Sequence, residues 1–213
     1  WSSVKLYFML GLPTETDEDV AAIAELVNKI VYCWRQSATN KKRRLSINLA
    51  TAFFVPKPFT PFQWERQTSP EEYLRRVHLL QSCLTARGVD YRYHESDLSR
   101  LEAVLARGDR RLSKVLLRAH ELGCKLDGWD EYFRYDLWMQ AFSDCGVDPE
   151  FYTTRGFGED EILPWQTIDI GVSRDFFLRE RALAYQSVTT PDCRTKCAGC
   201  GARSLSERGV CDE

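Results

Sequence analysis

No apolar run in the 213-residue sequence approaches the ~18 residues that a membrane-spanning helix needs, and no secretory signal is recognisable. We therefore expect no membrane partner. An excess of charge of one sign is also missing, since 29 basic residues are balanced by 31 acidic ones. Bulk charge thus gives no indication of a nucleic-acid partner, although it does not exclude a local basic patch that binds one. An initiator methionine is missing as well. The sequence starts at Trp1 and soon enters an apolar run, so we expect a fragment or cleaved product of a longer protein.

The composition that is present is that of an ordinary globular protein, with 44% hydrophobic and 28% charged residues, long enough for one large or two small domains. The eight cysteines stand out. Half of them crowd the end of the sequence, which favours metal or cluster ligation in a reducing compartment, so we expect a cytoplasmic protein. The others lie in apolar or helical stretches and are interpreted as small buried hydrophobes: Cys33, Cys83, Cys124 and Cys145.

The first third of the sequence predicts a strand, a helix and a second strand. A strand-like apolar run at 4–10 ends at Gly11, and helical spacing follows Thr14 and Thr16, either of which suits a helix N-cap. The second strand-like run, 45–55, stops at a proline-rich segment. Two consecutive strands joined by a helix belong to a parallel sheet or barrel.

Near residue 95 the pattern changes from α/β to mainly α. A capping motif at Ser69 with Pro70 at the first helical position predicts a helix that reaches 87, and a short strand is expected at 89–93. Further helices are expected at 96–107, 111–122, 130–145 and 173–186. We therefore divide the chain into a strand–helix–strand unit (1–66), a closing helix and short strand (67–95), a helical extension (96–190) and a cysteine-rich tail (191–213).

Two segments at strand ends are candidates for ligand contact. Ligands of α/β folds bind at the carboxyl ends of strands, and Gly11 would let one approach the backbone. A plain strand–helix turn explains the same residues. In the proline-rich segment, Lys57 could meet an anion and Phe62 or Trp64 could stack on a ring. A stiff loop packed by its own aromatics is the alternative.

Arg107, Arg110 and Arg111 form a local basic patch in the sequence. It could bind phosphate or RNA, and a solvent-exposed junction between two helices is the alternative.

The order of several stretches carries a resemblance to a known family. LYFMLGLPTETDED and FVPKPFTPFQW come first, followed by SRLEAVLARGDRR, LDGWDEYFRYDLW, LPWQTIDIGVSRDFFLRE and TPDCRTKCAGCG. In this order they resemble the carboxyl-terminal part of radical S-adenosylmethionine (radical SAM) proteins that carry an N-terminal cobalamin-binding domain, a family of poorly defined reaction. The resemblance covers almost the whole chain.

That resemblance implies the last two strands of a partial (β/α)6 barrel, followed by a helical extension. It also implies contacts with S-adenosylmethionine at two strand ends. The family's motif has glutamate three residues after its glycine, where this sequence has Thr14, with Glu15 next. The implied cofactor-binding residues are Leu10, Gly11, Pro13, Glu15, Phe54, Val55 and Pro56.

The resemblance further implies a catalytic [4Fe–4S] cluster whose ligands lie in the N-terminal remainder of the protein. We therefore expect this chain to be inactive alone and the full-length protein to be an enzyme that cleaves S-adenosylmethionine reductively. Cobalamin is an optional further cofactor. The substrate is open, with RNA among the candidates.

The tail holds Cys193, Cys197 and Cys200 with the spacing CxxxCxxC, and Cys211 follows. The spacing equals that of the radical SAM cluster motif, but the catalytic motif belongs after the first barrel strand, not after the helices. Four thiolates fit structural zinc or an auxiliary iron–sulfur cluster, and an unliganded tail is the alternative. The competing function is a non-catalytic helical binding module whose zinc-bound tail docks RNA or a protein.

Overall fold

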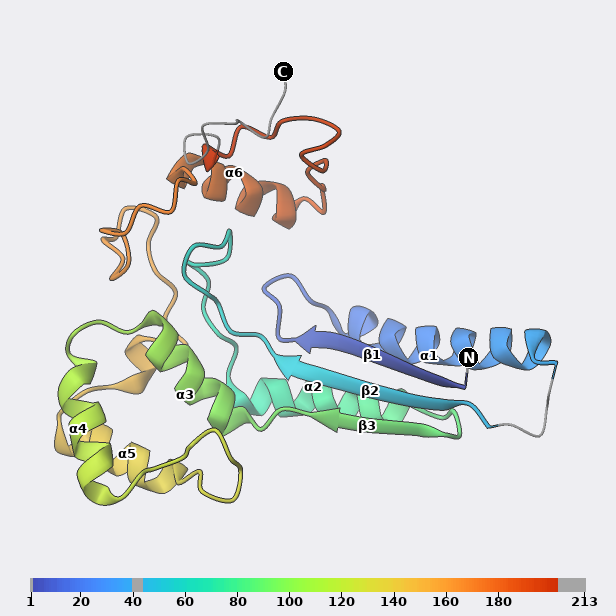
Figure 1. Ribbon diagram of the computed structural model, residues 1–213, viewed down its shortest axis with the longest axis horizontal. Coiled ribbons are helices and arrows are strands. Elements are labelled where there is room, and N and C mark those ends of the chain that lie inside the picture. Colours follow the sequence, from blue (N-terminus) through green and yellow to red (C-terminus); the bar gives the residue numbers. More distant parts are fainter. Residues whose placement is uncertain (1, 40–43, 203–213) are drawn as a thin grey trace.

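The computed structural model describes residues 2–39 and 44–202, and its first part is a small parallel sheet. The strands are β1 (Ser3–Leu10), β2 (Ser46–Phe53) and β3 (Val89–Tyr93), in the spatial order β1-β2-β3 (Figure 1). Register runs from Ser3 opposite Ser46 to Leu10 opposite Phe53, so β1 and β2 end together. The expected α/β class and the parallel pairing are therefore confirmed.

Two helices connect the strands and cover one face of the sheet. They are α1 (Asp17–Ser37) and α2 (Pro70–Cys83). Side chains alternate along a strand, so every second residue of β1 and β2 faces these helices. Burying this face supplies most of the apolar contact that holds the unit together. Its fully packed members are Leu10, Val20, Ile23, Ala24, Val27, Ile47, Leu49, Phe53, Tyr73, Val77 and Leu80.

The opposite face of the sheet is uncovered by the described residues. Tyr7 is 74% exposed and Met9 50% exposed on β1. A shallow hollow of about 250 Å³ lies on the same face, lined by Lys5, Tyr7, Asn48, Asp90 and Arg92 among others. Parallel sheets are normally covered on both faces. Within the described ranges, this face of the sheet is therefore exposed to solvent.

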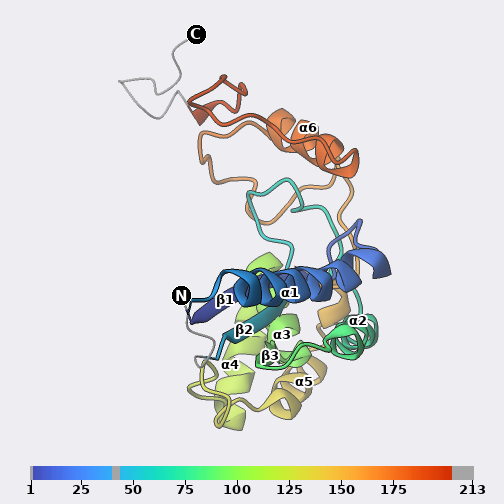
Figure 2. The same cartoon turned by 90° about the vertical axis from the view of Figure 1, so that its right-hand side faces the viewer.

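After β3, the described residues form helices joined by loops. A second core is formed by three helices, α3 (Ser96–Arg107), α4 (Leu112–Leu122) and α5 (Tyr135–Asp144). Tyr152, which follows the 3-10 turn Pro149–Phe151, packs into the same core. The last helix, α6 (Arg174–Tyr185), lies apart from this core (Figures 1 and 2). The proline-rich loop after β2 extends from the strand ends toward α6 and shares a third, aromatic core with it. No helix in these described ranges is long and apolar enough to cross a bilayer.

Most expected elements are confirmed, but several boundaries are shifted and most of the expected cysteine burial is wrong. The strand at 89–93 and the helix at 96–107 have the expected bounds. Helix α2 ends at Cys83 instead of 87, and α5 begins at Tyr135 instead of 130. Residues before α5 form turns around Leu126, whose φ of 60° is left-handed. Four cysteines were expected to be buried, and only Cys124 is; Cys33 is exposed on α1, and Cys83 and Cys145 are half-buried.

The N-terminus of α1 is held by a reciprocal capping box. The Thr16 hydroxyl accepts from the Asp19 amide at 3.3 Å, and the Asp19 carboxylate accepts from the Thr16 amide at 2.9 Å. Thr16→Ala is therefore expected to lower the free energy of unfolding by about 1 kcal/mol, measured by denaturant titration. Thr14→Ala is the matched control, because Thr14 is exposed and caps no helix. Equal losses from the two variants would contradict the assignment.

Candidate functional site

The two strand ends singled out in the sequence lie side by side. Leu10 pairs with Phe53, and the Phe54 amide donates to the Leu10 carbonyl at 2.9 Å. The loops that follow therefore leave from the same end of the sheet. This is the end at which open parallel sheets bind ligands, and it is the candidate functional site of this chain.

The residues at the end of β1 are used mainly for packing. The Leu10 side chain is fully buried in the core beneath the helices. Gly11 has φ of +91°, and a Cβ there would lie 3.1 Å from the Thr68 methyl and 3.3 Å from the Phe53 ring. Glycine is thus required by backbone conformation and by close packing. The fold therefore explains why this position is glycine, without any reference to a ligand.

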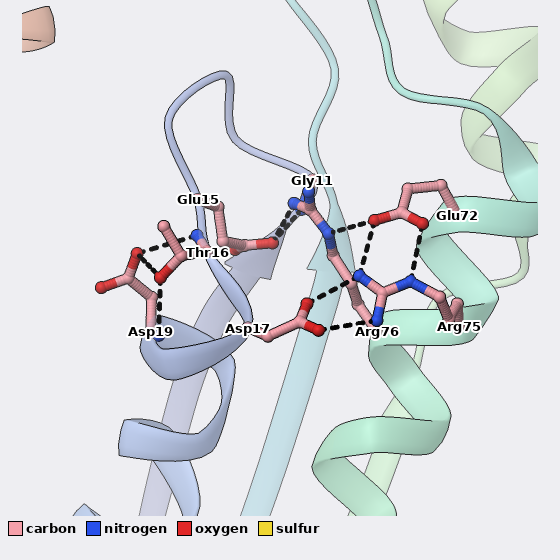
Figure 3. A network of polar contacts seen from close by, with 8 residues as sticks. All are labelled: Gly11, Glu15, Thr16, Asp17, Asp19, Glu72, Arg75 and Arg76. Atoms are coloured by element: carbon pink, nitrogen blue, oxygen red, sulfur yellow. Dashed lines mark hydrogen bonds and ion pairs between the residues drawn. The ribbon is translucent and has the colours of Figure 1, made fainter.

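The Glu15 side chain folds back into this turn and links it to a neighbouring helix. Its carboxylate accepts from the Gly11 amide at 2.8 Å and pairs with the Arg76 guanidinium at 2.5 Å, and its side chain is only 6% exposed (Figure 3). Burial raises the pKa of Glu15, opposed by the hydrogen bond from Gly11 and by Arg76. The carboxylate expected to contact the cofactor is therefore placed against Gly11 and Arg76, where it ties the loop to α2.

Arg75 and Arg76 extend this contact into a network. Arg75 binds Asp17 with both terminal nitrogens, at 2.6 and 3.0 Å, and also binds Glu72 at 2.7 and 2.8 Å (Figure 3). Arg76 donates to Glu72 at 3.0 Å. The network joins the first turns of α1 and α2 and fixes both next to the end of β1. Sequence reasoning missed it, because no local pattern links Asp17 to Arg75.

The ion pairs with Arg75 and Arg76 lower the pKa of Glu72 to about 2. A carboxylate whose pKa is lower in the folded than in the unfolded protein stabilises the folded state while it is ionised. For Glu72 this stabilisation is fully present above the unfolded-state pKa, about 4.5, and is lost as the pH falls toward 2. Glu72→Gln is therefore expected to flatten the pH dependence of stability between these values. Because the side chain is 34% exposed, solvent screens the pairs, and the expected loss at pH 7 is only about 1 kcal/mol. Thermal unfolding from pH 2 to 7 measures it, and an unchanged slope would contradict it.

At the end of β2, some backbone groups make hydrogen bonds within the described ranges and others do not. The Phe54 carbonyl accepts from Gln67 Nε2 at 3.1 Å, and the Phe54 ring meets Phe62 edge to face at 6.0 Å. The Val55 peptide N–H and C=O make no hydrogen bond with any described residue. Pro56 is buried and has no N–H to donate. Of the predicted residues, Val55 therefore offers the backbone groups that a ligand can engage.

Arg107 was expected in an exposed basic patch, and that expectation is wrong. Its side chain is fully buried, its Nη1 donates to the Glu65 carbonyl, and its guanidinium lies 4.4 Å from the Phe157 ring centroid. Burial, reinforced by nearby Arg155, lowers the pKa of Arg107 to about 10. Arg111 is instead bound by Asp109 at 2.6 Å on the surface. Arg107 thus fastens α3 to the loop after β2 and is not available to an external anion.

The cysteine tail forms a loop seated on the start of α6. Cys193 and Cys197 are exposed and Cys200 is half-buried. The Gly199 amide donates to the Cys197 sulfur and the Ala202 amide to the Cys200 sulfur, both at 3.4 Å. The Cys200 carbonyl accepts from the Ser173 amide at 2.8 Å.

No three metal-ligating side chains converge among residues 2–39 and 44–202. Cys211, the fourth expected ligand, lies outside the described residues.

Comparison with known proteins adds one distant relative. No protein-family profile matches the chain, and no solved structure matches it. An uncharacterised protein of Methanocaldococcus jannaschii is 28% identical over 144 residues, which is 68% of this chain and 30% of that protein. The chain therefore spans about 30% of the length of this relative.

Proposed function

We propose that this chain is the carboxyl-terminal wall of a radical SAM enzyme and contributes one side of its S-adenosylmethionine site. The single observation that supports this most strongly is the three-stranded parallel sheet, which has helices on one face and an open polar face on the other. A sheet of this kind is complete only when further layers or strands cover it. In a barrel, the open face would point to the lumen.

The free edge of β1 supports the same proposal. Among the described strands, β1 pairs only with β2. A groove of about 340 Å³ follows its other edge and is lined mostly by apolar side chains, including Phe8, Met9, Leu12, Ile23 and Leu26. Unpaired strand edges favour pairing with another strand. The proposed occupant is the preceding strand–helix unit of the same protein, which is consistent with a relative of greater length.

The residues at the strand ends fit the cofactor in part. Val55 would engage the nucleoside through its unpaired peptide groups, and Pro56 would shape the rim beside it. Gly11 and Glu15 would act indirectly, by holding the end of β1 against β2. The reductive cleavage of S-adenosylmethionine that starts the radical reaction belongs to the cofactor and its cluster, held by another part of the protein. This chain would orient the nucleoside and exclude water.

The test uses the full-length protein that contains this chain, reconstituted anaerobically with iron and sulfide and supplied with a reductant. We expect S-adenosylmethionine to be converted to 5′-deoxyadenosine, measured by chromatography. The 213-residue chain alone, treated identically, is expected to form none. Product from the isolated chain would contradict the division of roles, and no product from the full-length protein with an intact cluster would contradict the function.

The tail carries a second, separable proposal: Cys193, Cys197, Cys200 and Cys211 bind zinc or an auxiliary iron–sulfur cluster. The two amide-to-sulfur hydrogen bonds favour it, since such bonds orient and stabilise thiolate ligands. The same geometry supports the alternative function, a non-catalytic module whose zinc-bound tail docks RNA or a protein. Zinc without 5′-deoxyadenosine formation by the full-length protein would favour that alternative.

A further inference from the structure

Gln67 lies between the proline-rich loop and α2, and only 1% of its surface is exposed. Its side-chain Nε2 donates to two backbone carbonyls, that of Phe54 at 3.1 Å and that of Ser99 at 3.3 Å. A carbonyl oxygen only accepts hydrogen bonds, so the amide nitrogen faces both carbonyls and has one hydrogen for each of them. A single buried side chain therefore joins the end of β2 to helix α3.

The backbone around Gln67 is also held by the helical extension. The Gln67 peptide amide donates to the carbonyl of Thr153, a fully buried residue, at 2.9 Å. Two residues earlier, the Glu65 carbonyl accepts from the buried Arg107 of α3. Both contacts come from residues that follow β3 in the sequence. The position of Gln67 next to the sheet therefore depends on the packing of the helical extension.

The hydrogen bond from Gln67 sets the direction of the next N–H along the chain. The Phe54 C=O and the Val55 N–H belong to one peptide group, which is planar and trans. In a trans peptide these two groups point in opposite directions, so the Val55 N–H points away from Gln67. Pro56 follows, and a proline restricts the backbone of the residue before it. The direction of this donor, unpaired within the described ranges, is thus constrained from both sides.

From these contacts we propose that Gln67 is a positioning residue of the strand-end site. It aims the Val55 N–H at the nucleoside of S-adenosylmethionine and thereby makes the helical extension part of that site. This inference rests on the proposed function, because it assigns that ligand to the Val55 peptide. The Gln67 Nε2 is already engaged by two carbonyls, so its effect reaches the ligand only through the peptide group that it orients.

Residual dipolar couplings of the ¹⁵N,²H-labelled 213-residue chain test this orientation without any cofactor. We expect Gln67→Met, which keeps a similar side-chain length but has no donor, to shift the Val55 N–H coupling beyond experimental error. Gln63→Met is the matched control, because Gln63 is also buried in this loop but accepts from Trp165 and Phe59, away from the strand end. An unchanged Val55 coupling in Gln67→Met, or an equal change in the control, would overturn the proposal.

A measurement on the unmodified chain keeps the proposal testable if Gln67→Met does not fold. The side-chain amide hydrogens of Gln67 are expected to exchange with solvent roughly 10-fold more slowly than those of Gln63. Both residues are buried, but the Gln63 Nε2 makes no hydrogen bond with any described residue. Equal exchange rates would show that Gln67 does not hold the Phe54 carbonyl, and this result would overturn the proposal.

Binding of S-adenosylmethionine to the full-length protein with its cluster tests the consequence for the site. Gln67→Met is expected to raise the Kd about 3- to 10-fold, the value of one hydrogen bond, measured by calorimetric titration. Gln63→Met is expected to leave the Kd unchanged. Equal Kd values for wild type and Gln67→Met would overturn the positioning role. A full-length protein that binds no S-adenosylmethionine would instead contradict the proposed function and the ligand assigned to Val55, and the dipolar couplings would still decide whether Gln67 orients the peptide.

Discussion

Glu15→Ala is expected to lower the free energy of unfolding by about 3 kcal/mol, because it removes one partner from each of two buried groups. The Gly11 amide loses its acceptor, and the Arg76 guanidinium, 13% exposed, loses the closer of its two carboxylates. For a chain of this length, such a change corresponds to a decrease of roughly 6–12 °C in Tm. Thermal unfolding of the 213-residue chain at pH 7 measures it.

Glu25→Ala is the matched control for this experiment. Glu25 is exposed on α1, and its loss is expected to change stability by less than about 0.5 kcal/mol. The stability of the Glu15→Gln variant should lie between those of the two alanine variants. Its amide oxygen still accepts a hydrogen bond from Gly11 but no longer neutralises the charge of Arg76. A Glu15→Ala variant as stable as the Glu25→Ala variant would show that the network in Figure 3 does not hold the end of β1.

Metal loading of the tail is the second large effect. The chain purified anaerobically is expected to hold about one zinc ion or one iron–sulfur cluster. Cys197→Ser removes one of four proposed thiolates and should lower metal affinity by roughly 100-fold or more, since even outer-sphere changes cost about 10–100-fold. Elemental analysis after dialysis against a chelator measures the difference.

Cys33→Ser provides the control, because Cys33 is also exposed but lies on α1, away from the tail. It is expected to leave the metal content unchanged. A wild-type chain without metal, or equal retention by the two variants, would contradict the metal site. Zinc would indicate a structural role for the tail, and iron with sulfide would indicate an auxiliary cluster.

Residue patterns predicted the local structure of this protein well, because local structure depends on neighbouring residues. The short strand predicted at 89–93 is β3, and threonine followed by acids predicted the start of α1. The order of the strand-end motifs also predicted two segments at one end of a parallel sheet, and β1 and β2 do end in register. The late start of α5 was missed because the residues before it form successive turns, and the left-handed position among them is a leucine, Leu126, a residue type that does not signal this conformation.

The roles of individual side chains depended on contacts between distant parts of the chain. Glu15 follows a strand-end glycine and was interpreted as a ligand contact, but Arg76 from α2 reaches it. Arg107 sits in a basic run that resembles a solvated patch, yet Glu65 and Phe157 enclose it. In both cases the partner lies more than forty positions away in the sequence.

The sequence by itself thus determined the α/β class, the parallel order of the first strands, the helical extension and the cysteine spacing of the tail. Each of these follows from periodicity or spacing over a few turns. Only the tertiary structure decided that Glu15 and Leu10 are used inside the fold and that Val55 keeps unpaired peptide groups. Burial and hydrogen bonding depend on which distant residues the folded chain brings together, and a linear pattern does not specify those partners.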